Sequence, residues 1–263
     1  MLGAIIGDII GSRWEFNPTN DYNFQLFSDK NGFTDDTICT IAVADAILSK
    51  KDYGVSIHEW CNRYPDPMGA YGGRFGQWVK NNTPKPYNSF GNGSAMRVSP
   101  IGMYYKEMQT VIDEAMKTAV CTHNHPEGMK GAVSIAHAIY LAIHYTDTFG
   151  KEEHSKVSKK IAQTIATEYG YNIQIIKKHV LNKFDETCQG TVPVALWIIS
   201  ESHSFEDAIR NAISLGADAD TLGAIIGSIA EHIWGIPEWI KEKAFEFIPD
   251  TMKEVIELFY KSV

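Results

Sequence analysis

Apolar residues recur at intervals of three and four along most of the chain, the spacing of one face of an α-helix. The pattern predicts helices over the ranges 2–11, 38–48, 109–121, 127–145, 161–169, 173–184, 191–203, 205–215, 222–234, 238–247 and 251–261. Ser56 and Glu59 have the spacing of a capping box for a further short helix that ends near Tyr64. We therefore expect an all-α protein, and its 263 residues fit one helical domain over 1–263.

Small residues mark two of these helices as tightly packed. Gly3, Gly7 and Gly11 lie one turn apart, so a neighbouring helix can approach closely along that face. The string Gly-Ala-Ile-Ile-Gly that begins at Gly3 returns at residues 223–227. We interpret the two strings as two closely packed core helices.

Two clusters of acids and threonines each stand at a predicted helix start. Thr34-Asp35-Asp36-Thr37 opens the run 38–48, and Asp218-Ala219-Asp220-Thr221 opens the run 222–234. One such cluster alone is best explained as a cap, with Thr34 as N-cap and the acids complementing the helix dipole. Capping needs only one acceptor, and both clusters follow a glycine and precede an apolar helix. We therefore expect the two helix starts to converge on shared hard cations.

Glu15 lies in a polar and aromatic loop, residues 12–33, between a buried helix and the first acid cluster. A loop glutamate is usually only solvated. In this position it could instead swing over the cations as a mobile ligand or a proton-transfer group.

Two glycine clusters and a histidine pair add candidate ligand contacts. Gly72 and Gly73 free the backbone to approach a ligand. The turn Gly91-Asn92-Gly93-Ser94, with Arg97 close behind, suits an anion such as a diphosphate. The alternative is that both glycine clusters are ordinary turns and that Arg97 is a surface side chain. His123 and His125 are two residues apart, and loop capping and ligand contact both remain open for them.

Composition excludes several other classes. The 32 acids outnumber the 24 basic residues, so we expect the surface to repel nucleic acid. The four cysteines form no Cys-x-x-Cys pair, which argues against zinc ribbons and redox motifs. Residues 1–8 lack a basic region before a short apolar run, and no apolar run is long enough for a bilayer. We expect a cytoplasmic protein with free thiols and no membrane partner.

Five motifs in order give the chain a resemblance to the ADP-ribosylglycohydrolase family over essentially its whole length. They are Gly7-Asp8 with Gly11 and Glu15, Thr34-Asp35-Asp36-Thr37, Gly91-Asn92-Gly93 with Met96-Arg97, Thr122-His123 with His125-Pro126, and Gly216-Ala217-Asp218-Ala219-Asp220-Thr221. The family includes dinitrogenase reductase-activating glycohydrolase and the ADP-ribosyl-acceptor hydrolases. The resemblance implies a single orthogonal helical bundle with a central dinuclear site for two divalent cations, Mg²⁺ or Mn²⁺.

The resemblance also implies roles for individual residues. The metal ligands would be Thr34, Asp35, Asp36, Asp218, Asp220 and Thr221. Glu15 takes the position of the mobile acid, and either Glu15 or Asp35 would manage the proton. The groove for ADP-ribose would be lined by Gly72, Gly73, Gly91, Asn92, Gly93, Ser94 and His123, with Arg97 as the candidate anion contact. Asp8 would be structural and would fix the loop that carries Glu15.

The chemistry expected by resemblance is hydrolysis of the glycosidic bond between ADP-ribose and an acceptor. That reaction passes through an oxocarbenium-like centre, and cations can orient the ribose and activate water. Arginine of an ADP-ribosylated protein is the first expectation. Serine, a nucleic-acid end or a small metabolite would present the same ribose.

Three other classes fit the sequence less well. A helical phosphohydrolase would need a His-Asp dipeptide, which is absent, and a prenyl synthase would need Asp-Asp-x-x-Asp, whereas Asp36 is followed by Thr37, Ile38 and Cys39. A non-catalytic ADP-ribose-binding relative should have lost metal acids, and none is missing.

Overall fold

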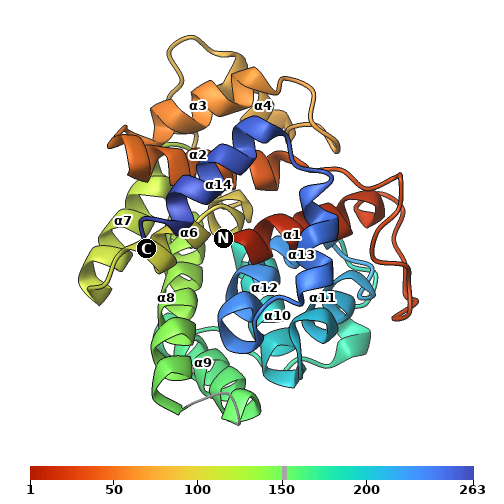
Figure 1. The fold of residues 1–263 in the computed structure, drawn as a ribbon. Coiled ribbons are helices and arrows are strands. Elements are labelled where there is room, and N and C mark those ends of the chain that lie inside the picture. The colour runs from red at the N-terminus through yellow and green to blue at the C-terminus, as the bar shows by residue number, and fades with distance from the viewer. Residues whose placement is uncertain (150–152) are drawn as a thin grey trace.

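Helices α1 (Leu2–Gly11) and α12 (Ala219–Trp234) lie side by side at the centre of the fold (Figure 1). Every residue of α1 is buried. A Cβ atom added at Gly223 would lie 2.5 Å from the carbonyl oxygen of Gly7, so the two backbones touch where the glycines face each other. The tightly packed helices predicted from the glycine strings are confirmed, and they pack against one another.

The computed structural model describes residues 1–149 and 153–263, and within them it contains no strand, only an isolated bridge between Gly91 and Thr187. The all-α prediction is confirmed. Besides the central pair the helices are α2 (Asp35–Ser49), α3 (Tyr53–Arg63), α4 (Gly73–Lys80), α5 (Gly93–Met96), α6 (Ser99–Tyr104), α7 (Met108–Val120), α8 (Pro126–Phe149), α9 (His154–Tyr169), α10 (Cys188–Glu201), α11 (Phe205–Ile213), α13 (Glu238–Phe245) and α14 (Asp250–Tyr260).

The other helices surround the central pair. Helix α2 packs against α1, α3 and α14, and α12 is also covered by α8, α10 and α11. In Figure 1, α2, α3, α4 and α14 gather at one end of the molecule, and α9 lies at the other end, against α8. The chain therefore brings the starts of α2 and α12 together in the middle of the bundle.

Two local predictions were wrong. Residues 173–184 contain only a 3₁₀ turn at Lys177–His179 instead of a helix. The side chain of Asn172 accepts a hydrogen bond from the backbone of Gln174 near the start of this segment, and Asn182 near its end has a positive φ of 56°, so neither end is helical. The cap of α3 is Asp52, which accepts from Val55 N, while the hydroxyl of Ser56 donates to Ala42 O.

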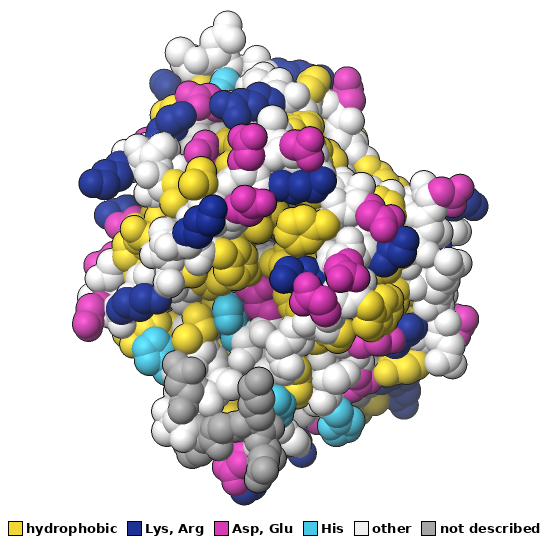
Figure 2. Space-filling model, in the orientation of Figure 1, with side chains coloured by type: hydrophobic (Ala, Val, Ile, Leu, Met, Phe, Trp, Pro, Cys, Tyr) yellow, Lys and Arg dark blue, Asp and Glu magenta, His cyan; other side chains and the backbone are white. Residues whose placement is uncertain are grey.

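The surface carries mixed charge. On the face drawn in Figure 2, Asp and Glu side chains are interspersed with Lys and Arg, and the coloured part of that face has no continuous basic area. All four cysteines are free thiols, as predicted. Among the helices of the described residues, none is both long and apolar enough to cross a membrane.

Candidate metal centre and ligand cavity

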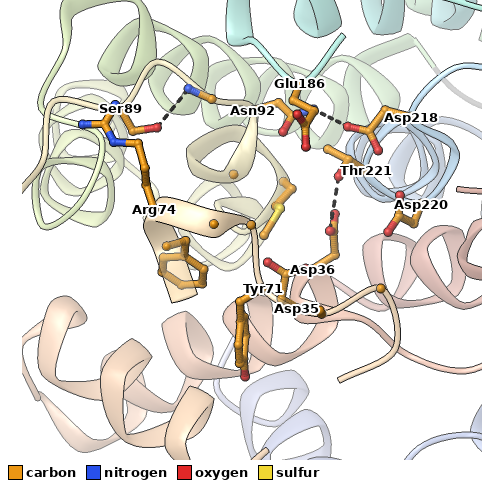
Figure 3. A pocket seen from close by; sticks show the side chains of 18 of the residues that line it. Asp35, Asp36, Tyr71, Arg74, Ser89, Asn92, Glu186, Asp218, Asp220 and Thr221 are labelled. Atoms are coloured by element: carbon orange, nitrogen blue, oxygen red, sulfur yellow. Dashed lines mark hydrogen bonds between the residues drawn. The ribbon is translucent and has the colours of Figure 1, made fainter. Parts of the chain in front are cut away.

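The starts of α2 and α12 meet, as the two acid clusters predicted (Figure 3). Thr34 caps α2 by accepting from Asp36 N at 3.2 Å. The hydroxyl of Thr221, in the first turn of α12, lies 3.3 Å from Asp36 Oδ2. Asn92, from the glycine turn, donates to Asp218 Oδ2 at 2.7 Å. Hydrogen bonds to Asp36 and to Asp218 thereby join three distant segments.

Asp8 holds the first of these helix starts in place. Its carboxylate is fully buried and accepts hydrogen bonds from the backbone N–H and the hydroxyl of both Thr34 and Thr37. The structural role expected for Asp8 is present, but its target is the start of α2 and not the loop that carries Glu15. The acids of α2 are thus presented by a turn that α1 anchors directly.

Glu15 reaches the acids of α12. It follows the 3₁₀ turn Ser12–Trp14 at the end of α1 and is half-buried. One carboxylate oxygen each from Glu15, Asp218 and Asp220 lie within 4.8 Å of one another. Three oxygens at this separation can share one hard cation.

The carboxylates of the cluster lack the partners that would balance their charge. Oxygen atoms of Glu15, Asp36 and Asp220 are buried with no hydrogen-bond partner among the described residues. Burial, followed by the charges of Asp218 and Asp35, raises the pKa of Glu15 to about 8. Burial, followed by Asp8, raises the pKa of Asp35 to about 7.

Burial and neighbouring acids also raise the pKa values of Asp36 and Asp220 far above their ordinary range. Buried carboxylates that repel one another and offer unpartnered oxygens form the donor set that a divalent cation requires. The residues present therefore fit the metal ions that the sequence implies.

The acid cluster forms one wall of a cavity of about 360 Å³. Its lining contains the following predicted residues: Glu15, Asp35, Asp36, Gly72, Gly73, Gly91, Asn92, Gly93, Arg97, His123, Asp218, Asp220 and Thr221. Thr34 and Ser94 are buried outside the lining, and the hydroxyl of Ser94 donates to Gly128 O at 2.7 Å. The glycine turns and the acids thus face a common space.

Arg97 is held differently from a surface arginine that awaits an anion. Its side chain is 1% exposed, and its Nη2 atom donates to Thr118 O and to Thr122 Oγ1, both at 2.8 Å. The guanidinium is therefore engaged by protein groups, although it touches the cavity wall.

The cavity has lining residues that the sequence reasoning did not single out. Arg74 donates to Tyr87 O, and its guanidinium lies 4.9 Å from the centre of the Tyr87 ring. Phe16 and Glu186 stand on the rim, and both are exposed. The position of Arg74 directly after Gly73 was an available signal. For aromatic and acidic loop residues such as Phe16, the sequence contains no signal that would place them at a cavity.

Comparisons with known proteins show what the whole chain is similar to. A sequence model described as ADP-ribosylglycohydrolase matches residues 1–262. The chain is 25% identical to the ADP-ribosylarginine hydrolase Tri1 of Pseudomonas putida, over 93% of this chain and 73% of that protein. It is also 25% identical to the ADP-ribosylhydrolase ARH3 of Homo sapiens, over 90% of this chain and 85% of that protein.

A solved structure titled "ADP-ribosylglycohydrolase-related protein complex" superimposes with a TM-score of 0.71 at 22% identity. The superposition covers 99% of this chain and 96% of that one, so the two share the fold.

Proposed function

This chain belongs to the ADP-ribosylglycohydrolase family and is an ADP-ribosyl hydrolase; on that premise we propose that it releases ADP-ribose from the arginine side chain of a modified protein. The proposal includes two divalent cations, Mg²⁺ or Mn²⁺, held by Thr34, Asp35, Asp36, Asp218, Asp220 and Thr221. The observation that carries it is the convergence of two acidic helix starts, with unpartnered buried oxygens, on one wall of the cavity.

The residues of the chain account for the other requirements of the reaction. Bound at the acid cluster, the cations would orient the ribose diol and lower the pKa of a water molecule. Asn92 holds Asp218 by its hydrogen bond, and Asp8 holds the start of α2 through Thr34 and Thr37. Preorganised ligands of this kind avoid rearrangement during the reaction.

Glu15 or Asp35 would move the proton. Without a cation, burial and neighbouring acids raise the pKa of Glu15 to about 8 and that of Asp35 to about 7. Bound cations would lower both pKa values, so that each carboxylate would be ionised, as a general base must be. Glu15 is carried by a loop, and a Cβ atom added at Gly69 would lie 2.5 Å from its carboxylate. Gly69 thus leaves room for Glu15 beside the cavity.

The rim of the cavity favours a cationic acceptor. Phe16 is 71% exposed and its ring centre lies 6.1 Å from that of Phe184, and Glu186 lines the same cavity. A guanidinium group can stack on an aromatic ring while pairing with a carboxylate. The similarity to an ADP-ribosylarginine hydrolase points the same way.

A panel of substrates tests the proposal. Peptides with ADP-ribose on arginine or serine, a nucleic-acid end that carries ADP-ribose, and a small ADP-ribose conjugate are incubated with Mg²⁺, with Mn²⁺ and with a chelator. We expect fastest release from arginine and loss of release with the chelator. Full release in chelator would refute the metal centre, and faster release from serine would refute the arginine assignment alone.

A further inference from the structure

Arg97, Thr122 and His123 form a short chain of hydrogen bonds beneath the cavity. Arg97 Nη2 lies 2.8 Å from Thr122 Oγ1, and Thr122 Oγ1 lies 2.6 Å from His123 Nδ1. All three side chains are at most 4% exposed. The two hydrogen bonds are therefore buried, although Arg97 and His123 also line the cavity.

The direction of the first bond follows from chemistry. A guanidinium only donates, so Thr122 Oγ1 accepts from Arg97. The hydroxyl has a single proton, and among the described residues its two neighbours besides Arg97 are His123 Nδ1 and Cys121 Sγ, the latter at 4.0 Å. A buried hydroxyl without an acceptor is strongly disfavoured, so the Thr122 O–H donates a hydrogen bond to His123 Nδ1.

An imidazole that accepts at Nδ1 must carry its own proton at Nε2. A ring with its proton at Nδ1 would place two donors on one oxygen and leave the hydroxyl proton only Cys121 Sγ, a weak acceptor at 4.0 Å. Burial, then the charges of Arg97 and Arg74, lowers the pKa of His123 far below its ordinary value, so the ring does not become an imidazolium. Tyr87, with its ring centre 6.2 Å away, adds no charge at neutral pH.

The Nε2 atom faces the glycine turn. Cβ atoms added at Gly91 and Gly93 would lie 3.5 and 3.3 Å from His123 Nε2. Within the described residues, Nε2 has no hydrogen-bond partner, and His123 lines the cavity. A donor without a protein acceptor therefore lies beside the turn that suits an anion.

We propose that Arg97 and Thr122 are positioning residues that lock His123 in the neutral Nε2–H form, which donates a hydrogen bond to a phosphate oxygen of the bound substrate. The phosphate contact rests on the proposed function, because ADP-ribose supplies the diphosphate. The tautomer itself does not depend on the substrate. Arg97 thus acts on the anion through His123.

Nuclear magnetic resonance of ¹⁵N-labelled histidine rings tests the tautomer in the ligand-free protein. The His123 signals, assigned by their loss in His123→Asn, should show a protonated Nε2 and an unprotonated Nδ1 between pH 6 and pH 8. Thr122→Val removes the hydroxyl while keeping the shape, and it should turn this single form into a mixture. Thr122→Ser should restore the single form.

Thr118→Val is the matched control. It makes the same change in a buried threonine whose hydroxyl donates to Ala115 O and does not touch His123. It should leave the histidine signals unchanged. In the hydrolase assay, Thr122→Val should raise KM about tenfold with little change in kcat, because the phosphate contact is remote from the bond that breaks.

An Nδ1-protonated or charged His123 in the wild-type protein would overturn the tautomer. An unchanged KM in Thr122→Val, in a protein that hydrolyses ADP-ribosyl substrates normally, would overturn the phosphate contact. If the wild-type protein shows the Nε2–H form but neither binds nor releases ADP-ribose, the tautomer stands and the proposed function fails, and the phosphate contact fails with it.

Discussion

The close contact of α1 and α12 makes Gly223→Ala a sharp test of how the core supports the site. The added Cβ would lie 2.5 Å from Gly7 O, and ordinary contact begins at 3.4 Å, so the helices must separate by 3.4 − 2.5 = 0.9 Å. Overpacking of this kind costs about 1–3 kcal/mol. For 263 residues, whose unfolding entropy is about 0.55 kcal/mol per kelvin, that corresponds to a fall in Tm of roughly 2–5 °C.

Gly223→Ala should lower the rate of ADP-ribose release even at a temperature where the variant is still folded. Gly223 lies three residues after Asp220, on the helix whose start carries proposed metal ligands. Metal sites tolerate about 0.2 Å of displacement, and a 1 Å displacement of catalytic groups can lower a rate about a hundredfold. We expect the loss of ADP-ribose release at 20 °C, where the variant is folded, to be at least about tenfold.

Two glycine substitutions serve as controls, with melting followed by circular dichroism and release measured with Mg²⁺. A Cβ at Gly102 would lie 2.6 Å from Ala136 O, so Gly102→Ala overpacks α6 against α8, away from the acids. It should lower Tm but spare activity. A Cβ at Gly76 would meet nothing closer than 3.5 Å, and Gly76→Ala should not lower Tm. An unchanged Tm in Gly223→Ala, or equal losses of activity in Gly223→Ala and Gly102→Ala, would refute the reasoning.

Three further outcomes are expected. Mg²⁺ should raise the Tm of the wild-type protein but not that of Asp36→Asn. The release of ADP-ribose by Asp36→Asn should fall more than about a hundredfold. If Mg²⁺ still raised the Tm of this variant, Asp36 would not be a metal ligand. Asp8→Asn replaces the acceptor of four hydrogen bonds by an amide with one oxygen, and urea unfolding should show a loss of about 2–4 kcal/mol; no loss would mean that these bonds do not hold the start of α2. In chelator, the raised pKa of Glu15 contributes stability that is present below its ordinary pKa of 4.5 and lost as pH rises to about 8, so Tm should be higher at pH 6 than at pH 8.5. Glu15→Gln or added Mg²⁺ should reduce that difference, and an equal difference in Glu15→Gln would exclude Glu15 as its source.

Most helices were predictable because helical periodicity is a local property. The predicted helix 127–145 is part of α8, which runs on to Phe149, and the helix predicted over 161–169 begins earlier, at His154. Residues 173–184 have a helical spacing of apolar residues but adopt turns, with Ile176 and Phe184 exposed. There Asn172 accepts a hydrogen bond from Gln174 N and Asn182 has a positive φ, and neither feature can be read from the apolar periodicity.

The site was predictable in its acids but not in its supporting bonds. Asp36 and Asp218 are each recognisable from their own helix start. That Asp8 accepts from Thr34 and Thr37, or that Asn92 donates to Asp218, depends on where distant helices cross. Arg97 illustrates the same limit. Its sequence context indicates an anion contact, but in the structure it is buried and its Nη2 atom donates hydrogen bonds to Thr118 and Thr122.

The sequence by itself determined the helical class, the two glycine strings that mark tightly packed core helices and the acids that form the candidate metal centre, because each is a short-range pattern of residue types. The tertiary structure decided which oxygens remain unpartnered, which loops form the cavity and which side chain lies against His123 Nδ1. These depend on distances between residues as far apart as Asp36 and Thr221, and only the packed path of the whole chain sets such distances.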